Sequence, residues 1–275
     1  LSKGEYQLKL PPPFIPGMEV AGVVSSAPDG SGFAVGQRVC ASVLGGYAEQ
    51  VSAPVANVKP SPAELDDAEA VSLLVNYHTM YFAFERRAAL RPSETVLVLG
   101  AAGGIGVAAI QVAQAMGARV IAVVHRSAAM EFVSSLGPDA VIPLGEGWAQ
   151  AVRDATGGRG VDVVVDPIGG PAFDDAIRVL ATDGRLLVIG FAAGAIPTVK
   201  VNRLLLRNVG VLGVGYGEYI NRDPAAGVEF TEGLARLVAA GLKPPPPVRF
   251  PLSDGSVALQ LLDDGGVYGK LVLEP

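Results

Sequence analysis

The sequence predicts an α/β protein in which a doubly wound parallel sheet follows a β-rich N-terminal region. From Thr95 to Ala240, short runs rich in Val, Ile and Leu alternate with helical patterns. These runs show no regular alternation with polar residues, which is typical of strands covered on both faces. Residues 1–60 instead combine Gly- and Pro-rich turns with short β-type runs. Strands that alternate with helices form a parallel sheet, so the change of pattern near Thr95 indicates a second type of domain.

Composition limits the possible classes of protein. The 275 residues are 50% hydrophobic and carry a formal net charge of −6. A chain of this length can form one large hydrophobic core or two, and its apolar content is too high for a disordered protein. The absence of a long apolar run and of a basic block argues against a membrane or nucleic-acid partner. The single Cys40 excludes an internal disulfide and is expected to be a small buried residue. No signal peptide is visible, so a cytoplasmic location is expected.

The N-terminal region is expected to form a small barrel or sandwich. Its predicted strands cover residues 19–25, 38–40, 47–51 and 57–59. A helix is expected from Pro62, with Ser61 as its N-cap and Glu64 three residues after the cap. A second helix is expected from Val75 to Leu90.

The second region is expected to contain six strands, at residues 96–99, 119–124, 140–142, 162–166, 185–189 and 209–214. Its helices are expected at residues 104–116, 128–136, 148–155, 172–180 and 231–240. A Pro-rich connector after Lys243 leads to a helix at 255–262 and a strand at 270–273. We therefore expect one domain at 1–75 and another at 76–243, with residues 244–275 returning to the first.

A glycine cluster joins the first strand of the second region to its helix. A glycine at position 103 lets the backbone approach a pyrophosphate, and Gly106 lets the helix pack close to the strand. The helix N-terminus adds unpaired N–H groups and a positive dipole end. Ala101 departs from the usual pattern, which has a glycine there. The residues predicted to bind a dinucleotide at this turn are Ala102, Gly103, Gly104 and Ile105.

The end of the second strand favours NADP over NAD. NAD enzymes carry an acid there for the ribose 2′-hydroxyl, but no Asp or Glu occurs between Ala118 and Met130. The sequence at this place is His125-Arg126-Ser127, in which the arginine can pair with a 2′-phosphate and the serine can donate a hydrogen bond. In the alternative, Arg126 is a solvated loop residue and Ser127 caps the next helix.

Several motifs together resemble the medium-chain dehydrogenase/reductase superfamily. They are Phe14-Ile-Pro-Gly-Met-Glu-Val-Ala-Gly-Val-Val, Val35-Gly-Gln-Arg-Val and Gly45-Gly-Tyr-Ala-Glu. Ala101-Ala-Gly-Gly-Ile-Gly, Asp166-Pro-Ile-Gly-Gly, Gly184-Arg-Leu-Leu-Val-Ile-Gly-Phe and Tyr268-Gly-Lys-Leu-Val-Leu are similar to its zinc-free quinone oxidoreductase (zeta-crystallin-like) branch. The resemblance covers essentially the whole chain.

This resemblance implies a Rossmann dinucleotide domain inserted in a GroES-like β-barrel domain, with NADPH in the cleft and hydride passing to an acceptor. Family members begin a few dozen residues earlier, so the barrel is expected to be N-terminally incomplete and the natural protein longer. Zinc-dependent relatives carry Gly-His-Glu where this chain has Gly17-Met18-Glu19, and His78 and His125 lack ligand spacing. No metal is therefore expected.

The family also implies further site residues. Tyr6 matches a tyrosine that contacts the nicotinamide side of the cofactor, and it is the candidate proton donor; a surface tyrosine is the alternative. The other residues expected to bind the cofactor are Asn76, Thr79, Gly170, Gly190, Phe191, Val214 and Lys270. Helix capping by Asn76, tight turns at the glycines (Gly169 included) and a solvated Lys270 are the alternatives. His78 is expected to be a packing or surface residue.

The function expected is an NADPH-dependent, zinc-independent reductase that acts on a quinone. The same fold allows an enoyl or enone reductase, which needs an acid to protonate the α-carbon, so the small-molecule acceptor is a quinone or an activated alkene. A non-enzymatic structural or RNA-binding role is a further alternative, which the acidic balance disfavours. The run Val209 to Val214 resembles the edge strand through which family members pair, which predicts a homodimer.

Overall fold

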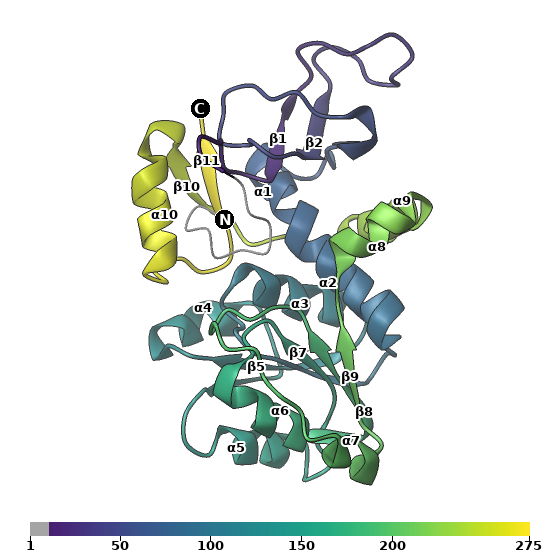
Figure 1. Cartoon of the computed structure of the whole chain (residues 1–275), viewed down its shortest axis with the longest axis vertical. Coiled ribbons are helices and arrows are strands. Elements are labelled where there is room, and N and C mark those ends of the chain that lie inside the picture. Colours follow the sequence, from purple (N-terminus) through teal and green to yellow (C-terminus); the bar gives the residue numbers. More distant parts are fainter. Residues whose placement is uncertain (1–10) are drawn as a thin grey trace. The chain divides into compact units, whose positions relative to one another are not determined.

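The computed structural model describes residues 11–275, and the chain divides into two compact units (Figure 1). Unit 1 contains the chain up to Val75 together with Lys243–Pro275, and unit 2 contains Asn76–Leu242. Tyr6 lies outside the described residues. Among the described residues, no helix has the length and apolar character needed to cross a membrane.

Unit 2 contains a six-stranded parallel sheet in the order β6-β5-β4-β7-β8-β9, which confirms the predicted doubly wound architecture. Its strands are β4 (Thr95–Val98), β5 (Arg119–Val124), β6 (Ala140–Pro143), β7 (Val161–Asp166), β8 (Leu180–Val188) and β9 (Gly210–Gly213). The chain moves outward from β4 to β6 and then returns to β7 on the other side of β4. The strand order therefore reverses between β4 and β7, in the middle of the sheet.

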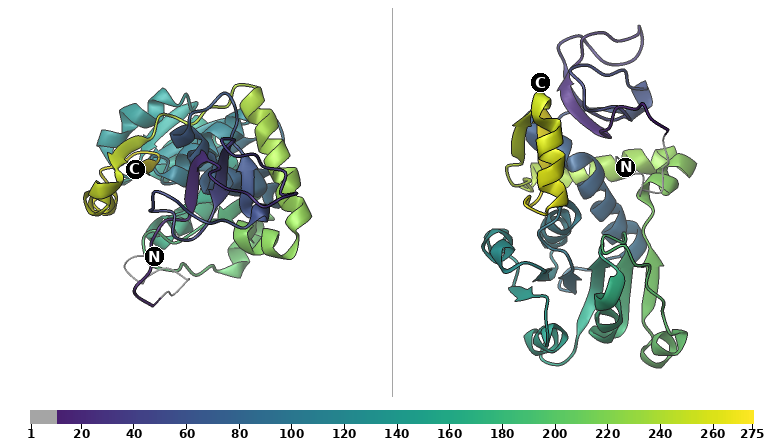
Figure 2. Two further views of the ribbon diagram at one scale, coloured as in Figure 1. Left: turned by 90° about the horizontal axis from the view of Figure 1, so that it is seen from above. Right: turned by 60° about the vertical axis from the view of Figure 1, so that its left-hand side comes forward.

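Helices lie on both faces of this sheet (Figures 1 and 2). They are α3 (Gly104–Ala115), α4 (Met130–Ser135), α5 (Trp148–Ala155), α6 (Phe173–Arg178) and α7 (Val201–Arg207). Two further helices, α8 (Tyr216–Arg222) and α9 (Pro224–Ala239), follow β9 and pack against α2 (His78–Phe82). Trp148 and Val152 of α5 and Phe173 and Ile177 of α6 pack with strand residues in one buried cluster. The sequence missed α7 and α8 and began α9 seven residues too late.

One long helical segment begins in unit 1 and continues into unit 2. It consists of α1 (Asp67–Ser72), a π-helical turn (Leu73–Tyr77), α2 (His78–Phe82) and a second π-helical turn (Ala83–Ala88). The prediction of a helix capped by Ser61 is wrong, because Asp66 is the N-cap. The Asp66 carboxylate accepts from the Glu69 amide at 2.8 Å, and the Glu69 carboxylate accepts from the Asp66 amide at 3.1 Å. This reciprocal pair satisfies two N–H groups that a helix start leaves unpaired.

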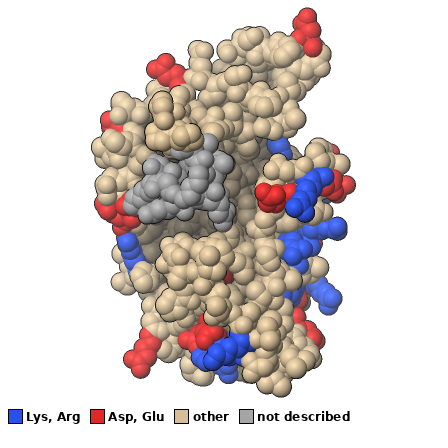
Figure 3. All heavy atoms as spheres, in the orientation of Figure 1, with Lys and Arg blue, Asp and Glu red and all other residues tan. Residues whose placement is uncertain are grey.

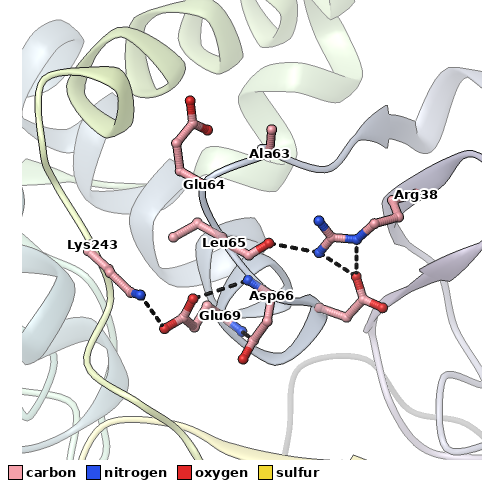
Figure 4. A pocket seen from close by; sticks show the side chains of 8 residues that line it. Arg38, Ala63, Glu64, Leu65, Asp66, Glu69 and Lys243 are labelled. Atoms are coloured by element: carbon pink, nitrogen blue, oxygen red, sulfur yellow. Dashed lines mark hydrogen bonds and ion pairs between the residues drawn. The ribbon is translucent and has the colours of Figure 1, made fainter.

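The same two carboxylates hold the C-terminal part of unit 1. Lys243 lies 2.9 Å from Glu69, and Arg249 pairs with Asp66. Figure 4 shows the open pocket around this cap, in which Arg38 also bonds the Leu65 carbonyl. Ion pairs also join Arg38 to Asp67, so the pocket connects segments that are distant in the chain, whereas Glu64, which also lines it, is exposed.

Unit 1 contains two small sheets. The strands β1 (Glu19–Val23), β2 (Arg38–Ser42) and β3 (Val58–Pro60) are antiparallel, whereas β10 (Val248–Pro251) and β11 (Leu271–Glu274) form a parallel pair. A helix, α10 (Gly255–Asp263), lies between these last two strands in the chain. Cys40 is buried on β2, as predicted.

The predicted strand at residues 47–51 is wrong. The chain there folds around Gly17: the Gly45 amide donates to the Gly17 carbonyl at 3.0 Å, and the Tyr47 amide donates to Pro16 at 2.9 Å. Gly17 has φ +94°, and a Cβ on it would lie 2.6 Å from the Tyr47 ring. Only glycine therefore fits this position without a shift of the chain.

We predict that Asp66→Ala lowers the unfolding free energy by about 1 kcal/mol, because it removes the cap. The Glu69 amide holds the pKa of Asp66 below its ordinary value of 3.8. A lowered folded-state pKa stabilises the fold above 3.8 and ceases to do so as the pH falls through the lowered value. Thermal unfolding should therefore show a difference between wild type and variant at pH 7 that shrinks in acid. Glu64→Ala, at an exposed residue of the same pocket, is the control and should unfold like the wild type.

Candidate functional site

The turn after β4 has the geometry of an anion site. Gly100 has φ +60°, Gly103 is the N-cap, and the 12-residue helix α3 follows. A Cβ on Gly106 would lie 2.3 Å from the Gly100 carbonyl oxygen, so the helix can approach the strand this closely only with glycine there. Ala102, Gly103, Gly104 and Ile105 are all at least partly exposed at this turn. The first amides of the helix have no helical acceptor and face the carboxyl edge of the sheet.

The loop after β7 lies beside this turn. A Cβ on Gly100 would lie 2.7 Å from Ile168 Cδ1, so the Ile168 side chain covers the turn at Gly100. The two strands that precede these segments, β4 and β7, are those between which the strand order reverses. Ligands of open α/β sheets bind at the carboxyl ends of the strands at such a reversal. Within unit 2, this edge is therefore the candidate cofactor site.

A third segment completes the edge. The Ala192 amide donates to Pro167 at 3.1 Å, the Ala193 amide to Ile168 at 3.0 Å, and the Gly170 amide to Ala195 at 3.3 Å. These bonds join residues 167–170 to residues 190–195, and so bring together Gly170, Gly190 and Phe191, three of the predicted residues. Val214, another, donates its amide to the Val188 carbonyl at 3.0 Å at the ends of β9 and β8.

His125, Arg126 and Ser127 follow β5, the strand next to β4, and all three are exposed. The alternative in which Ser127 caps a helix is wrong. Ser127 is the first residue of a 3₁₀ turn (Ser127–Ala129), and α4 begins only at Met130. The Arg126 guanidinium thus belongs to a short exposed segment at the same sheet edge as the glycine turn.

Asn76 and Thr79 lie in the long helical segment. Asn76 is inside the π-helical turn, so the alternative in which it caps a helix is wrong. Thr79 is buried, with 8% of its surface exposed. The neighbouring Tyr77 hydroxyl donates to Gln111 of α3, and burial raises the pKa of Tyr77 far above its ordinary value. This bond fixes α2 to the helix of the glycine turn.

His78 is a packing residue, as predicted. Only 5% of its surface is exposed, and its ring lies 6.0 Å from that of Tyr216. Its Nε2 atom lies 3.2 Å from the Thr231 hydroxyl of α9. It therefore joins α2 to α9.

In unit 1, Lys270 forms an ion pair with Glu19, and only 20% of its side chain is exposed. The solvated alternative for Lys270 is therefore wrong. The other oxygen of Glu19 accepts from the Val75 amide at 2.9 Å. Met18, next to Glu19, is 44% exposed. Across residues 11–275, no three His, Cys, Asp or Glu side chains are grouped as metal ligands.

Sequence reasoning missed the parts played by Glu19, Asp166 and Ile168. Asp166 ends β7 and is 1% exposed. A carboxylate that ends an apolar strand just before Pro-Ile-Gly-Gly is a turn signal that could have been used. The role of Glu19 had no comparable local signal, because its partners lie 56 and 251 residues away in the chain.

Two family models match the chain. The "Alcohol dehydrogenase GroES-like domain" matches residues 1–63, and the "Zinc-binding dehydrogenase" model matches residues 104–232. A curated relative, bovine quinone oxidoreductase-like protein 2, is 38% identical over 221 residues, which are 79% of this chain and 63% of the relative. The chain thus spans less than two thirds of that relative's length.

Solved structures are similar over nearly the whole chain. A probable oxidoreductase from Mycobacterium abscessus is 61% identical, with a TM-score of 0.92, over 100% of this chain and 84% of that one. The quinone oxidoreductase of Thermus thermophilus, solved alone and with NADPH, is 36% identical, with a TM-score of 0.83, over 98% and 84%. The CurK enoyl reductase is 27% identical, with a TM-score of 0.86, over 95% and 79%.

Two glycine variants separate binding from folding at the turn. Gly103 has φ −80°, and a Cβ there would meet only the Gly100 oxygen, at 3.5 Å. Gly103→Ala should therefore melt like the wild type, but its methyl group should weaken NADPH binding by about tenfold or more, because the backbone can no longer approach the pyrophosphate. Gly106→Ala should melt far lower, since strand and helix must separate. NADPH fluorescence titration and thermal unfolding measure both. A Gly103→Ala variant that binds NADPH like the wild type would contradict the assignment.

Proposed function

This chain belongs to the quinone oxidoreductase branch of the medium-chain dehydrogenase/reductase superfamily, and on that basis we propose that it is an NADPH-dependent reductase that passes a hydride to a quinone-type acceptor without zinc. The observation that carries the proposal is the carboxyl edge of the sheet in unit 2. There the glycine turn, the exposed Arg126 and the joined loops 167–170 and 190–195 follow strands on both sides of the order reversal.

The residues at this edge fit NADPH. The first amides of α3 would bind the pyrophosphate, and Arg126, with His125 and Ser127, would bind the 2′-phosphate where NAD enzymes carry an acid. When bound, the nicotinamide supplies the hydride. The backbone at Gly170, Gly190, Phe191 and Val214 would then line the nicotinamide end. That a similar quinone oxidoreductase was solved with NADPH supports this choice of cofactor.

The remaining predicted residues stay proposals. We propose that Tyr6 contacts the nicotinamide side of the cofactor and donates a proton, and that Asn76, Thr79 and Lys270 contribute to binding. Lys270 would do so while held by Glu19, whose charge fixes its amine. A quinone needs no strong protein acid, because its reduced oxygens can take protons from water.

Zinc independence rests on the donors in unit 1. Met18 stands where zinc-dependent relatives carry a histidine, and a neutral thioether is a poor zinc ligand beside imidazole or thiolate. The Glu19 carboxylate is already satisfied by Lys270 and the Val75 amide. Turnover should therefore be unchanged after dialysis against EDTA. Loss of activity that added Zn²⁺ restores would contradict this part of the proposal.

The similarity to the CurK enoyl reductase favours a second candidate, an enoyl or enone reductase. Such a reaction requires a proton at the α-carbon, for which Tyr6 is the candidate donor. Oxidation of NADPH should be measured with a quinone and with an enoyl thioester at matched concentrations. We expect turnover with the quinone. Turnover with only the thioester would replace the lead function by the second candidate.

A role in RNA binding is disfavoured by charge. The net charge is −6, and on the face drawn in Figure 3 the Lys and Arg side chains that gather at one edge have Asp and Glu beside them. RNA binding rests on Lys and Arg that neutralise phosphates, so such a surface is unsuitable. An RNA mobility shift at physiological salt that disappears at high salt would reverse this judgement.

We further propose that the chain forms a homodimer through the β9 edge of the sheet. β9 is the last strand of the six, and Leu205 and Leu206 of the adjoining α7 are 77% and 79% exposed. An open apolar edge of this kind is an aggregation hazard unless a second chain covers it. Sedimentation of the wild-type chain tests the proposal, and a monomer at micromolar concentration would contradict it.

We predict that Arg126→Ala weakens NADPH binding by about ten- to a hundredfold, because a charge-assisted pair with the 2′-phosphate is lost. NADH binding should not change, since NADH lacks that phosphate. Arg119→Ala is the matched control: Arg119 begins β5, whereas Arg126 follows its other end. Titration of both cofactors against both variants is the measurement. Equal losses for NADPH and NADH in Arg126→Ala would show that the arginine does not read the phosphate.

A further inference from the structure

Asp166 is the most deeply buried carboxylate among the described residues, and the chemistry described so far gives it no part. It ends β7 with 1% of its surface exposed. Burial raises the pKa of Asp166, and the hydrogen bonds that it accepts from two backbone amides oppose that rise. A carboxylate kept in such a place needs a structural or functional reason, because burying it is costly.

The contacts of Asp166 show what it holds. Its Oδ1 atom accepts from the Ile168 amide at 2.9 Å and from the Gly169 amide at 2.8 Å. Gly169 has φ +65° and ψ −142°, a conformation open only to glycine. The carboxylate therefore stabilises this turn, from which the Ile168 side chain lies against Gly100 of the glycine turn.

Residues 167–170 in turn form hydrogen bonds to a second loop, residues 190–195. Pro167 and Ile168 accept the amides of Ala192 and Ala193, and Gly170 donates to Ala195. A Cβ on Gly169 would lie 3.2 Å from the Phe191 ring, so this ring packs directly on the loop. The Asp166 side chain bonds the amides of Ile168 and Gly169, so an effect on residues 190–195 passes through residues 167–170.

We propose that Asp166 is a positioning residue for the nicotinamide half of NADPH: its carboxylate fixes residues 167–170, and through them residues 190–195, at the order reversal of the sheet. This inference rests on the proposed function for the identity of the ligand. The fixing of the two loops is a property of the chain alone and is measurable without cofactor. Asp166 acts through the loops and touches no reacting atom.

The same strand supplies a matched control. Asp162, near the amino end of β7, also accepts a backbone amide, from Thr95 at 2.8 Å, and also has a largely buried side chain, 14% exposed. It lies at the opposite edge of the sheet from the candidate site. Removal of either carboxylate costs a buried hydrogen-bond acceptor, so both variants should melt lower than the wild type. Only removal of Asp166 should change cofactor binding.

The experiment compares Asp166→Ala, Asp166→Asn and Asp162→Ala with the wild type. Hydrogen exchange of the cofactor-free proteins should accelerate in peptides covering both 167–170 and 190–195 in Asp166→Ala, and in neither in Asp162→Ala. The Kd for NADPH should rise about tenfold or more in Asp166→Ala, less in Asp166→Asn because its amide oxygen can still accept both bonds, and less than about twofold in Asp162→Ala. If Asp166→Ala does not fold, Asp166→Asn gives the comparison with smaller shifts in the same direction, because a neutral amide oxygen accepts these bonds more weakly than a carboxylate does.

Each outcome decides one claim. Faster exchange at 167–170 alone, or an unchanged Kd beside a lowered melting temperature, would overturn the positioning role and leave Asp166 a purely structural residue. A wild type that binds neither NADPH nor NADH would overturn the proposed function and with it the choice of ligand. The exchange data would then still show whether Asp166 fixes both loops.

Discussion

The close approach of α3 to β4 is the constraint on which the rest of unit 2 depends. A Cβ on Gly106 would fall 2.3 Å from the Gly100 carbonyl oxygen and 2.6 Å from Ala101 Cα. Because the helix starts so near the end of the strand, its first amides emerge at the carboxyl edge of the sheet. Every parallel strand ends at that edge, so the loops after β5, β7 and β8 come to the same place. The glycine contact thereby decides where a ligand can bind before any side chain is considered.

The second region was predictable because its signals are local. The helix starting at Gly104, the strand Arg119–Val124 and the helix Trp148–Ala155 agree with the sequence interpretation to within one residue. Buried parallel strands are continuous apolar runs, and their helices start and end at local signals. Because βαβ connections are almost always right-handed, few orders of the strands in the sheet are possible. Local pattern and topology therefore agree in the strands of unit 2, whereas the sequence interpretation missed α7 and α8.

The structure of unit 1 was harder to predict because its residues interact with partners that lie far away in the sequence. Residues 47–51 read as a strand but find no partner strand, because the preceding chain turns around Gly17. Ser61-Pro62 reads as a helix start, yet Asp66 and Glu69 cap each other and also bind Arg249 and Lys243, far along the chain. In the candidate site of unit 2, the glycine turn was predictable from its motif. The role of Glu19 in unit 1 was not, because its partner Lys270 lies 251 residues later in the chain.

The two units contribute different groups to the proposed reaction. In unit 1, the position that zinc-dependent relatives give to histidine holds Met18, and the adjoining Glu19 is neutralised by Lys270 and bonded to the backbone of Val75. On the proposed function, Met18 and the neutralised Glu19 thus hold no zinc ion to polarise an acceptor. A quinone needs none, since it accepts a hydride readily once the donor is oriented. The rate then depends on how firmly unit 2 holds the nicotinamide. That is a property of the glycine turn and of the loops joined behind Asp166, and it explains why a buried carboxylate is worth keeping at the end of β7.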